Sequence, residues 1–381
     1  MIYFDNAATT MLKPPGVAEA VAQAIGSFGG VGRGVHGASL DAGMTVFRVR
    51  QALSDLLGGP GAKQVAFASN ATEALNTAIL GLLRAGDHAV TTAASHNSVL
   101  RPLFRAQDAG IADASIVPIA PDGSLDYGAF AAAFQPNTRV AVVTHASNLT
   151  GDVYDIARLA NITHEQGALI VVDVAQTAGV VPIHMADQHL DVVCFTGHKS
   201  LFGPQGTGGL VVADSVDIAP LKEGGTGTHS YDRRQPDFMP ERLEAGTLNA
   251  HGLAGLLAGL TYIEGKGVPT IHKETLNLAR RFEEAVLEIP GVRVYGGHGG
   301  IDRTGVVALN IGAADSALVA DLLNTGFGIC TRAGAHCAPL MHEALGTSQQ
   351  GAVRFSFSHL NTADEVDAGV NAIRQIAKEL T

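Results

Sequence analysis

A lysine among small and hydroxyl-bearing residues is the first candidate for chemistry. Residues 196–200 have the sequence Thr-Gly-His-Lys-Ser, follow an apolar strand-like run and precede a glycine-rich stretch at 203–208. A buried lysine is unfavourable unless its charge is paired or its amine is used covalently. Lys199, at a strand end, is therefore a candidate for a Schiff base with a carbonyl compound. Considered alone, it would more often be a solvated lysine at the start of a loop.

A carboxylate upstream favours the covalent role. Residues 169–172 are apolar and lead into Asp173, which is followed by Val-Ala-Gln. In open α/β sheets, ligands bind beyond the carboxyl ends of the strands. Pyridoxal 5′-phosphate (PLP) needs a carboxylate that keeps its pyridine nitrogen protonated, so that the ring acts as an electron sink. Asp173 and Lys199 together therefore indicate a PLP site, although a lone Asp more often caps the next helix.

A third candidate lies between a strand-like run and a strong helical pattern. Residues 69–73 have the sequence Ser-Asn-Ala-Thr-Glu. Backbone N–H groups at a helix start attract a phosphate, and Thr72 could add its hydroxyl. Plain capping of the helix by Ser69 or Asn70 explains the same residues, so this signal is weak by itself.

The cysteines give a fourth candidate. Residues 330–339 have the sequence Cys-Thr-Arg-Ala-Gly-Ala-His-Cys-Ala-Pro. Their spacing matches no common zinc pattern, so we expect no metal site. Cys337 has a histidine beside it and Arg332 nearby, a setting typical of a thiol that acts as a nucleophile. A buried structural role is the better interpretation of Cys194 and Cys330.

The elements that must position these residues fall into two parts. In the first part, strand-like runs alternate with helical patterns at 72–83 and 156–166, which predicts a mainly parallel sheet covered by helices. The strand-like runs are 65–68, 88–92, 115–119, 140–144, 169–172, 192–196 and 209–212. The later runs follow one another with little helix between them, so one or two strands could be antiparallel. The segment from Glu223 to Pro240 is rich in Gly, Pro and charge, and predicts a long functional loop.

The second part begins at about residue 250 and predicts a smaller α+β domain with an antiparallel sheet. Its helical patterns are 251–263, 273–287, 316–324 and 365–379, and its strand-like runs are 292–295, 306–311 and 353–356. A chain of 381 residues is too long for one typical core. We therefore expect a large PLP-binding domain over 15–255 and a small domain over 256–381, joined by 1–14, that carries the cysteine segment.

Composition excludes several classes of function. With 46% hydrophobic and 16% charged residues, the chain is globular. Its net charge of −11 argues against a nucleic-acid partner, which requires a basic face. Three cysteines are too few and uneven for a disulfide framework, and fit a reducing cytosol. Apolar runs are short, and no signal-peptide pattern is seen, so we expect a cytoplasmic protein without a membrane helix.

Together the motifs resemble those of the cysteine desulfurases, in the class V aminotransferase-like family of PLP enzymes. The resemblance covers nearly the whole chain, and its matching motifs in the first part of the chain are 3–10, 69–74, 95–98, 147–151, 173–176, 196–199 and 244–249. The short segment 332–339 is similar to the group II branch, which contains the SufS-type enzymes. The Ala-Pro-Leu-Met after Cys337 and the run 223–228 resemble a less studied subgroup with suspected selenium enzymes. The resemblance implies PLP fold type I, with a mainly parallel seven-stranded sheet between helices.

The resemblance also implies roles for the matched residues. Lys199 would hold PLP and move the substrate's α-proton, Asp173 would pair with the pyridinium, and Gln176 would bond the ring hydroxyl. His96 would stack on the ring and could act as an acid or base. The phosphate would be held by Ala71, Thr72, Thr196 and His198.

Further roles concern the substrate and a second subunit. Thr247 would reach the phosphate of the other subunit, which implies a homodimer with shared active sites. Asn148 and Arg354 would bind the substrate carboxylate, a task suited to the bidentate guanidinium, and Arg332 would line the same pocket. Cys337 would take the sulfur of L-cysteine as a persulfide, release alanine and pass the sulfur to an acceptor protein.

Two departures from the family pattern and several alternatives remain. Ser95 stands where Glu is common, and Leu248 where Pro is common, but neither change removes a catalytic group. The substrate could be L-selenocysteine instead, as for a selenocysteine lyase. Another class V PLP enzyme, an aminotransferase or a C–S lyase, would not need Cys337. A non-catalytic scaffold for sulfur-transfer proteins would need none of these groups.

Overall fold

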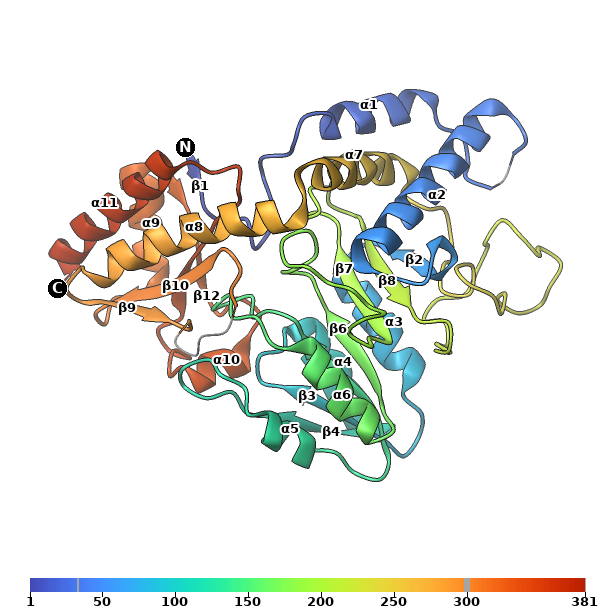
Figure 1. The fold of residues 1–381 in the computed structure, drawn as a ribbon, viewed down its shortest axis with the longest axis horizontal. Helices are drawn as coiled ribbons and strands as arrows, with labels where there is room; N and C mark the ends of the chain where they lie inside the picture. The colour runs from blue at the N-terminus through green and yellow to red at the C-terminus, as the bar shows by residue number, and fades with distance from the viewer. Residues whose placement is uncertain (33, 298–301, 381) are drawn as a thin grey trace.

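The computed structural model describes residues 1–32, 34–297 and 302–380, and has a large and a small lobe (Figure 1). The large lobe is built on a seven-stranded sheet with the order β2-β8-β7-β6-β5-β3-β4. Its strands are β2 (Val65–Ala68), β3 (Asp87–Thr92), β4 (Ala112–Val117), β5 (Thr138–Thr144), β6 (Leu169–Asp173), β7 (Val192–Thr196) and β8 (Gly208–Val212). Strand β8 runs antiparallel to both of its neighbours, β2 and β7, and the other neighbouring pairs are parallel. The prediction of a mainly parallel sheet with one or two antiparallel strands is therefore confirmed.

The sheet is buried on both faces, which explains the continuous apolar runs in its sequence. Ala141 and Val143 of β5 belong to one hydrophobic cluster, whereas Val140 and Val142 belong to another. Successive side chains of a strand point to opposite faces, so the two clusters lie on the two sides of the sheet. The helices of this lobe are α1 (Val17–Ser27), α2 (Gly37–Leu57), α3 (Ala71–Leu82), α4 (Asn97–Asp108), α5 (Tyr127–Ala132), α6 (Ile156–Glu165) and α7 (Ala250–Lys266), with the 3₁₀ turn η1 (Ala62–Gln64).

The small lobe has a four-stranded antiparallel sheet with the order β12-β13-β10-β9, as predicted for this part of the chain. Its strands are β9 (Val292–Tyr295), β10 (Val306–Ile311), β12 (Arg332–Gly334) and β13 (Ala352–Ser356), and its helices are α8 (Val268–Leu287), α9 (Ser316–Phe327), α10 (Pro339–Ala344) and α11 (Ala363–Leu380). The N-terminal strand β1 (Ile2–Tyr3) pairs with β11 (Ile329–Cys330). Phe4 packs into the core of this lobe with Phe282 and Phe355. The boundary expected at residue 255 lies inside α7, and the domain division stays a prediction.

Helix α2 was not among the predicted helices, because it is apolar on more than one side: Val46 and Leu53 are buried, whereas Met44 and Phe47 are exposed. The segment from Glu223 to Pro240 has no helix or strand, as predicted, and projects from the large lobe (Figure 1). No helix of the described residues is both long and apolar enough to cross a membrane.

Candidate active site

A cavity of about 470 Å³ lies where the parallel strands of the large sheet end. Nine of the predicted site residues line it: Ala71, Thr72, His96, Asn148, Asp173, Gln176, Thr196, His198 and Lys199. They come from the ends of β6 and β7 or just beyond them, from the segment after β5, from the start of α3 and from the residue before α4. Parallel strands end at one edge of a sheet, which is why residues more than a hundred positions apart meet here.

Lys199 and Asp173 form the charged pair of the cavity. Asp173 is the last residue of β6, is 5% exposed and accepts a hydrogen bond from the Ala175 N–H at 2.9 Å. Burial raises the pKa of Asp173, while that N–H and the Lys199 charge oppose the rise. Desolvation lowers the pKa of Lys199 to about 8, against the attraction of Asp173. Within the described residues the Lys199 amine has no hydrogen-bond or ion-pair partner, so it is available for covalent chemistry.

His96 is neutral and its tautomer follows from its contacts. It is the N-cap of α4, and its Nδ1 accepts from the Ser98 N–H at 3.0 Å. Because a backbone N–H can only donate, Nε2 carries the ring proton. Burial, followed by the positive charge of Lys199 and of nearby arginines, lowers the pKa of His96 to about 4. The Ser95 hydroxyl bonds the Thr91 hydroxyl at 2.9 Å.

The other end of the cavity has the character of an anion site. Asn70 caps α3 by accepting from the Glu73 N–H at 3.0 Å, and the first N–H groups of the helix have no intrahelical partner. The Thr196 hydroxyl is buried and has no hydrogen-bond partner. His198 bonds the Thr9 hydroxyl through Nδ1 at 3.0 Å. Buried polar atoms are normally paired, so the unpaired Thr196 hydroxyl has the capacity to bind an anionic ligand.

The cysteine segment of the small lobe is attached to the wall of this cavity. The Arg332 guanidinium donates to Cys337 Sγ at 3.9 Å. The Asn148 amide donates to the His336 carbonyl at 2.6 Å, and the Asn97 N–H donates to the Cys337 carbonyl at 2.8 Å. Cys337 is therefore held next to Asn148 and to the residue that follows His96, with a cation beside its sulfur.

Arg354 lies at the centre of a buried polar group. It is 1% exposed, pairs with the Asp5 carboxylate at 2.8 Å and donates to the Asn148 carbonyl at 2.9 Å. Its Nε and the Asn148 Oδ1 are buried without partners, which leaves capacity for a carboxylate or amine. The pairing of Arg354 with Asp5 was not predicted from the sequence, although Asp5 lies in the matching segment 3–10.

Thr247 does not line this cavity in its own chain. It is exposed and borders a separate hollow with Ser69, Lys222 and Glu244. Glu244 is anchored by a bidentate ion pair with Arg50, with both oxygens at 2.7 Å from the guanidinium. The assignment of Thr247 to a phosphate of another subunit stays a prediction.

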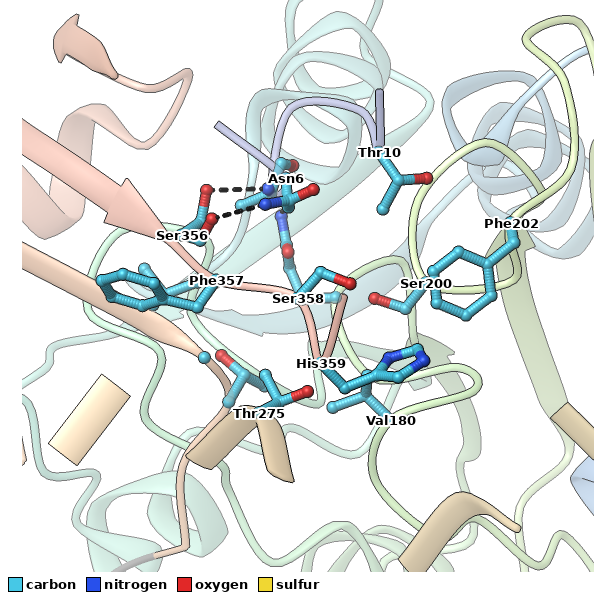
Figure 2. Close-up of a pocket in the computed structure, with 15 residues that line it drawn as sticks. Asn6, Thr10, Val180, Ser200, Phe202, Thr275, Ser356, Phe357, Ser358 and His359 are labelled. Atoms are coloured by element: carbon cyan, nitrogen blue, oxygen red, sulfur yellow. Dashed lines mark hydrogen bonds between the residues drawn. The ribbon is translucent and has the colours of Figure 1, made fainter. Parts of the chain in front are cut away.

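A second polar chamber adjoins the cavity, and Gln176 lines both of them. It lies between the N-terminal segment, the turn at Ser200 and the residues after β13. Figure 2 shows Asn6 bonded to Ser356, and His359 facing the chamber. Its lining contains no lysine, carboxylate or cysteine, so the candidate chemistry belongs to the first cavity.

The first cavity therefore fits PLP by the chemistry of its groups. It offers an unpaired amine, a buried carboxylate, a helix start and an unpaired hydroxyl, which match the aldehyde, the pyridine nitrogen and the phosphate. Across the ranges 1–32, 34–297 and 302–380, no group of three His, Cys, Asp or Glu side chains could hold a metal ion.

Comparisons with known proteins agree with this geometry. The family model "Aminotransferase class-V" matches residues 2–368. A "Probable cysteine desulfurase" of Methanothermobacter thermautotrophicus is 32% identical, over 99% of this chain and 94% of its own. The apo structure of a cysteine desulfurase from Thermococcus onnurineus NA1 has a TM-score of 0.92 at 32% identity, covering 99% of this chain and 95% of its own. The structure of the Escherichia coli cysteine desulfurase CsdA (S-sulfonic acid) has a TM-score of 0.88 at 30% identity, covering 99% and 94%.

The match to the family model and the identity over almost the full length confirm the predicted family and fold. The seven-stranded mixed sheet and the small antiparallel sheet are also as the resemblance implied. The chain thus belongs to the class-V aminotransferases, a PLP-dependent family, and within that family to the cysteine desulfurases.

Proposed function

We propose that this protein converts L-cysteine to L-alanine and takes the sulfur onto Cys337 as a persulfide. The observation that carries the proposal is the attachment of the Cys337 segment to the wall of the Lys199 cavity, through Asn148 and Asn97. An aminotransferase or a C–S lyase needs no thiol in this position. The names of the full-length relatives support the same reaction.

PLP, when bound here, would supply an electron sink that stabilises negative charge at the substrate α-carbon. Lys199 would hold the cofactor and then move the α-proton, since its pKa of about 8 lies close to physiological pH and both protonation states are accessible. Asp173 would pair with the pyridinium, and Gln176 would bond the ring hydroxyl. His96 would stack on the ring, and its Nε2–H could serve as an acid. The phosphate would be bound by Ala71, Thr72, Thr196 and His198.

The substrate carboxylate would bind to Arg354 and Asn148, with Arg332 nearby. Cys337 would attack the substrate sulfur as a thiolate, which the Arg332 guanidinium is placed to stabilise. A sulfur–sulfur bond forms while the bond from substrate sulfur to the β-carbon breaks. The electron pair of the broken bond stays on the β-carbon, which takes a proton and becomes the methyl group of alanine. The two thiols together give one persulfide and alanine, so no other oxidant or reductant is required.

The first test is alanine released from L-cysteine, with a thiol reductant present, by wild type and by Cys337→Ala. Alanine from wild type alone would support the proposed reaction. Alanine from both proteins would remove Cys337 from the mechanism. Alanine from neither would overturn L-cysteine as the substrate, and L-selenocysteine would then be tested. Residual turnover of selenocysteine by the variant is compatible with the proposal, because some relatives release selenium without a cysteine nucleophile.

We also propose a homodimer in which Thr247 serves the phosphate of the second subunit. Support comes from α2, where Leu40, Met44 and Phe47 are 57%, 53% and 51% exposed at a helical spacing. Such a row of exposed apolar side chains on one helix face marks an interaction site. From Cys337 the sulfur would pass to an acceptor protein, and the three free cysteines fit a reducing cytoplasm.

A further inference from the structure

A buried chain of three polar side chains lies behind Cys337. His336, His342 and Thr347 are each 2% exposed. The two imidazole rings are nearly parallel, at 11° with centroids 5.7 Å apart. His336 Nε2 is 3.1 Å from the Arg332 carbonyl, His336 Nδ1 is 3.4 Å from His342 Nε2, and His342 Nδ1 is 2.7 Å from the Thr347 hydroxyl. None of the three side chains lines the cavity that holds Lys199.

The partners of each ring decide where the protons lie. A carbonyl oxygen only accepts, so His336 Nε2 carries a proton and donates to Arg332. Burial lowers the pKa of His336 to about 3 and also lowers that of His342, so both rings are neutral. His336 Nδ1 is then an acceptor, and the proton between the rings belongs to His342 Nε2. His342 Nδ1 in turn accepts from the Thr347 hydroxyl. Each side chain therefore donates to the next one, from Thr347 through His342 and His336 to the Arg332 carbonyl.

The hydrogen-bonded side chains of His336, His342 and Thr347 lie next to a backbone segment with an unfavourable conformation. His336 and Cys337 both have positive φ, at 51° and 56°, although neither is glycine. Side chains disfavour this left-handed region, so other contacts must hold it. From outside, Asn148 and Asn97 bond the carbonyls of His336 and Cys337. Within the segment, the His336 ring donates a hydrogen bond to the carbonyl of Arg332, four residues earlier in the chain.

We propose that His342 and Thr347 are positioning residues that act through His336 to hold the Cys337 sulfur beside the Arg332 guanidinium. Neither residue touches the reacting atoms. The expected effect on turnover rests on the proposed function, because a displaced Cys337 sulfur would attack the substrate sulfur more slowly. The geometric content of the proposal is independent of that function, since it concerns how reactive the Cys337 thiol is.

The test uses the PLP-loaded protein and pairs of matched variants. His342→Phe keeps a ring of similar size but has no donor, whereas His342→Gln keeps an N–H at the far end of the side chain. Thr347→Val removes the hydroxyl at nearly constant volume, and Thr347→Ser keeps it. The measured quantity is the rate at which iodoacetamide alkylates Cys337, followed by mass spectrometry of its peptide. Absorbance of the bound cofactor checks that the cavity is intact.

We expect His342→Phe and Thr347→Val to slow alkylation of Cys337 at least about threefold, toward the rate of Arg332→Gln. The thiolate is the form that reacts, and a sulfur displaced from the Arg332 guanidinium loses the positive charge that stabilises it. His342→Gln and Thr347→Ser should stay near wild type. With L-cysteine, the first pair should lower kcat and leave KM unchanged. Alkylation of His342→Phe and Thr347→Val at the wild-type rate or faster would overturn the inference. So would equal slowing in His342→Gln and Thr347→Ser.

If His342→Phe does not fold, the Thr347 pair decides by itself. If wild type makes no alanine from L-cysteine, the proposed function fails, while the alkylation rates still decide whether the chain positions Cys337.

Discussion

Arg332 and Arg354 lie directly opposite each other on the antiparallel strands β12 and β13. Residues in this relation share one face of the sheet, and like charges placed so destabilise it. The charge of Arg354 is balanced by its ion pair with Asp5. Arg332 contacts Cys337 Sγ and has no carboxylate partner among the described residues. An anion between them would relieve the repulsion, which fits a pocket for the substrate carboxylate.

Arg332→Gln should therefore raise KM for L-cysteine about tenfold to a hundredfold, because a hydrogen bond to a charged group contributes roughly 1.5–3 kcal/mol. Steady-state kinetics of the variant measure this. Arg332→Lys keeps the positive charge but loses the planar guanidinium. Its KM for L-cysteine should therefore lie between those of wild type and Arg332→Gln. An unchanged KM in Arg332→Gln would show that Arg332 does not bind the substrate.

The lowered pKa of Lys199 makes the uptake of PLP dependent on pH. The neutral amine is the nucleophile, so the rate at which PLP-free protein takes up the cofactor should rise with pH and level off above about 8. A lysine with its ordinary pKa near 10.5 would show a rise that continues well beyond that point. Stopped-flow absorbance of the bound cofactor follows the reaction.

Lys199→Ala should bind PLP without the absorbance of the covalent form and should lose turnover by more than about a thousandfold. Assay of alanine from L-cysteine checks the second point. Turnover within tenfold of wild type would remove Lys199 from the mechanism.

His145 should make the protein sensitive to acid. It is buried, bonds the Thr177 hydroxyl at 2.9 Å, and burial lowers its pKa to about 4. Between pH 6.5 and about 4, His145 is protonated in the unfolded chain but stays neutral in the folded protein. The contribution of His145 to stability is therefore complete above 6.5 and is lost as pH falls toward 4, by up to about 1.4 kcal/mol per pH unit.

Urea unfolding of wild type and His145→Gln between pH 4 and 7 measures this. The difference in the free energy of unfolding between the two proteins should shrink as pH falls. Parallel pH curves for the two proteins would contradict the prediction.

The ion pair of Arg50 with Glu244 should behave as a buried pair. Both side chains are 9% exposed, and Glu244 also accepts from the Phe67 N–H at 2.6 Å. Glu244→Gln leaves the Arg50 charge unpaired and should lower the free energy of unfolding by about 3–5 kcal/mol. The double variant Arg50→Met with Glu244→Leu should lose less than the single variant, as denaturant unfolding would show. A greater loss in the double variant would mean that the pair itself stabilises the fold.

The exposed face of α2 provides a test of the dimer. Phe47→Glu should shift the protein from dimer to monomer in analytical ultracentrifugation, because it places a charge in an apolar contact. Leu318→Glu is the matched control, since Leu318 is 46% exposed on the distant helix α9 and should leave the dimer intact. A dimeric Phe47→Glu protein would place the interface elsewhere.

The sequence by itself predicted the large sheet and the family, and it singled out Lys199 and Asp173, which the structure brings into one cavity. Strands buried on both faces appear as continuous apolar runs, and a polar residue just beyond such a run must lie at the sheet edge where ligands bind. Helix α2 was missed because its exposed apolar face, proposed above for the dimer, blurs the helical stripe.

Only the tertiary structure decided which residues contact one another across the two lobes. Asp5 and Arg354 are 349 positions apart, and Asn148 and His336 are 188 apart. No local pattern encodes such distances, because they depend on how the small lobe packs against the large one. The tautomers of His96 and His336 belong to the same class, since a ring proton is placed by its partner and not by its neighbours in sequence.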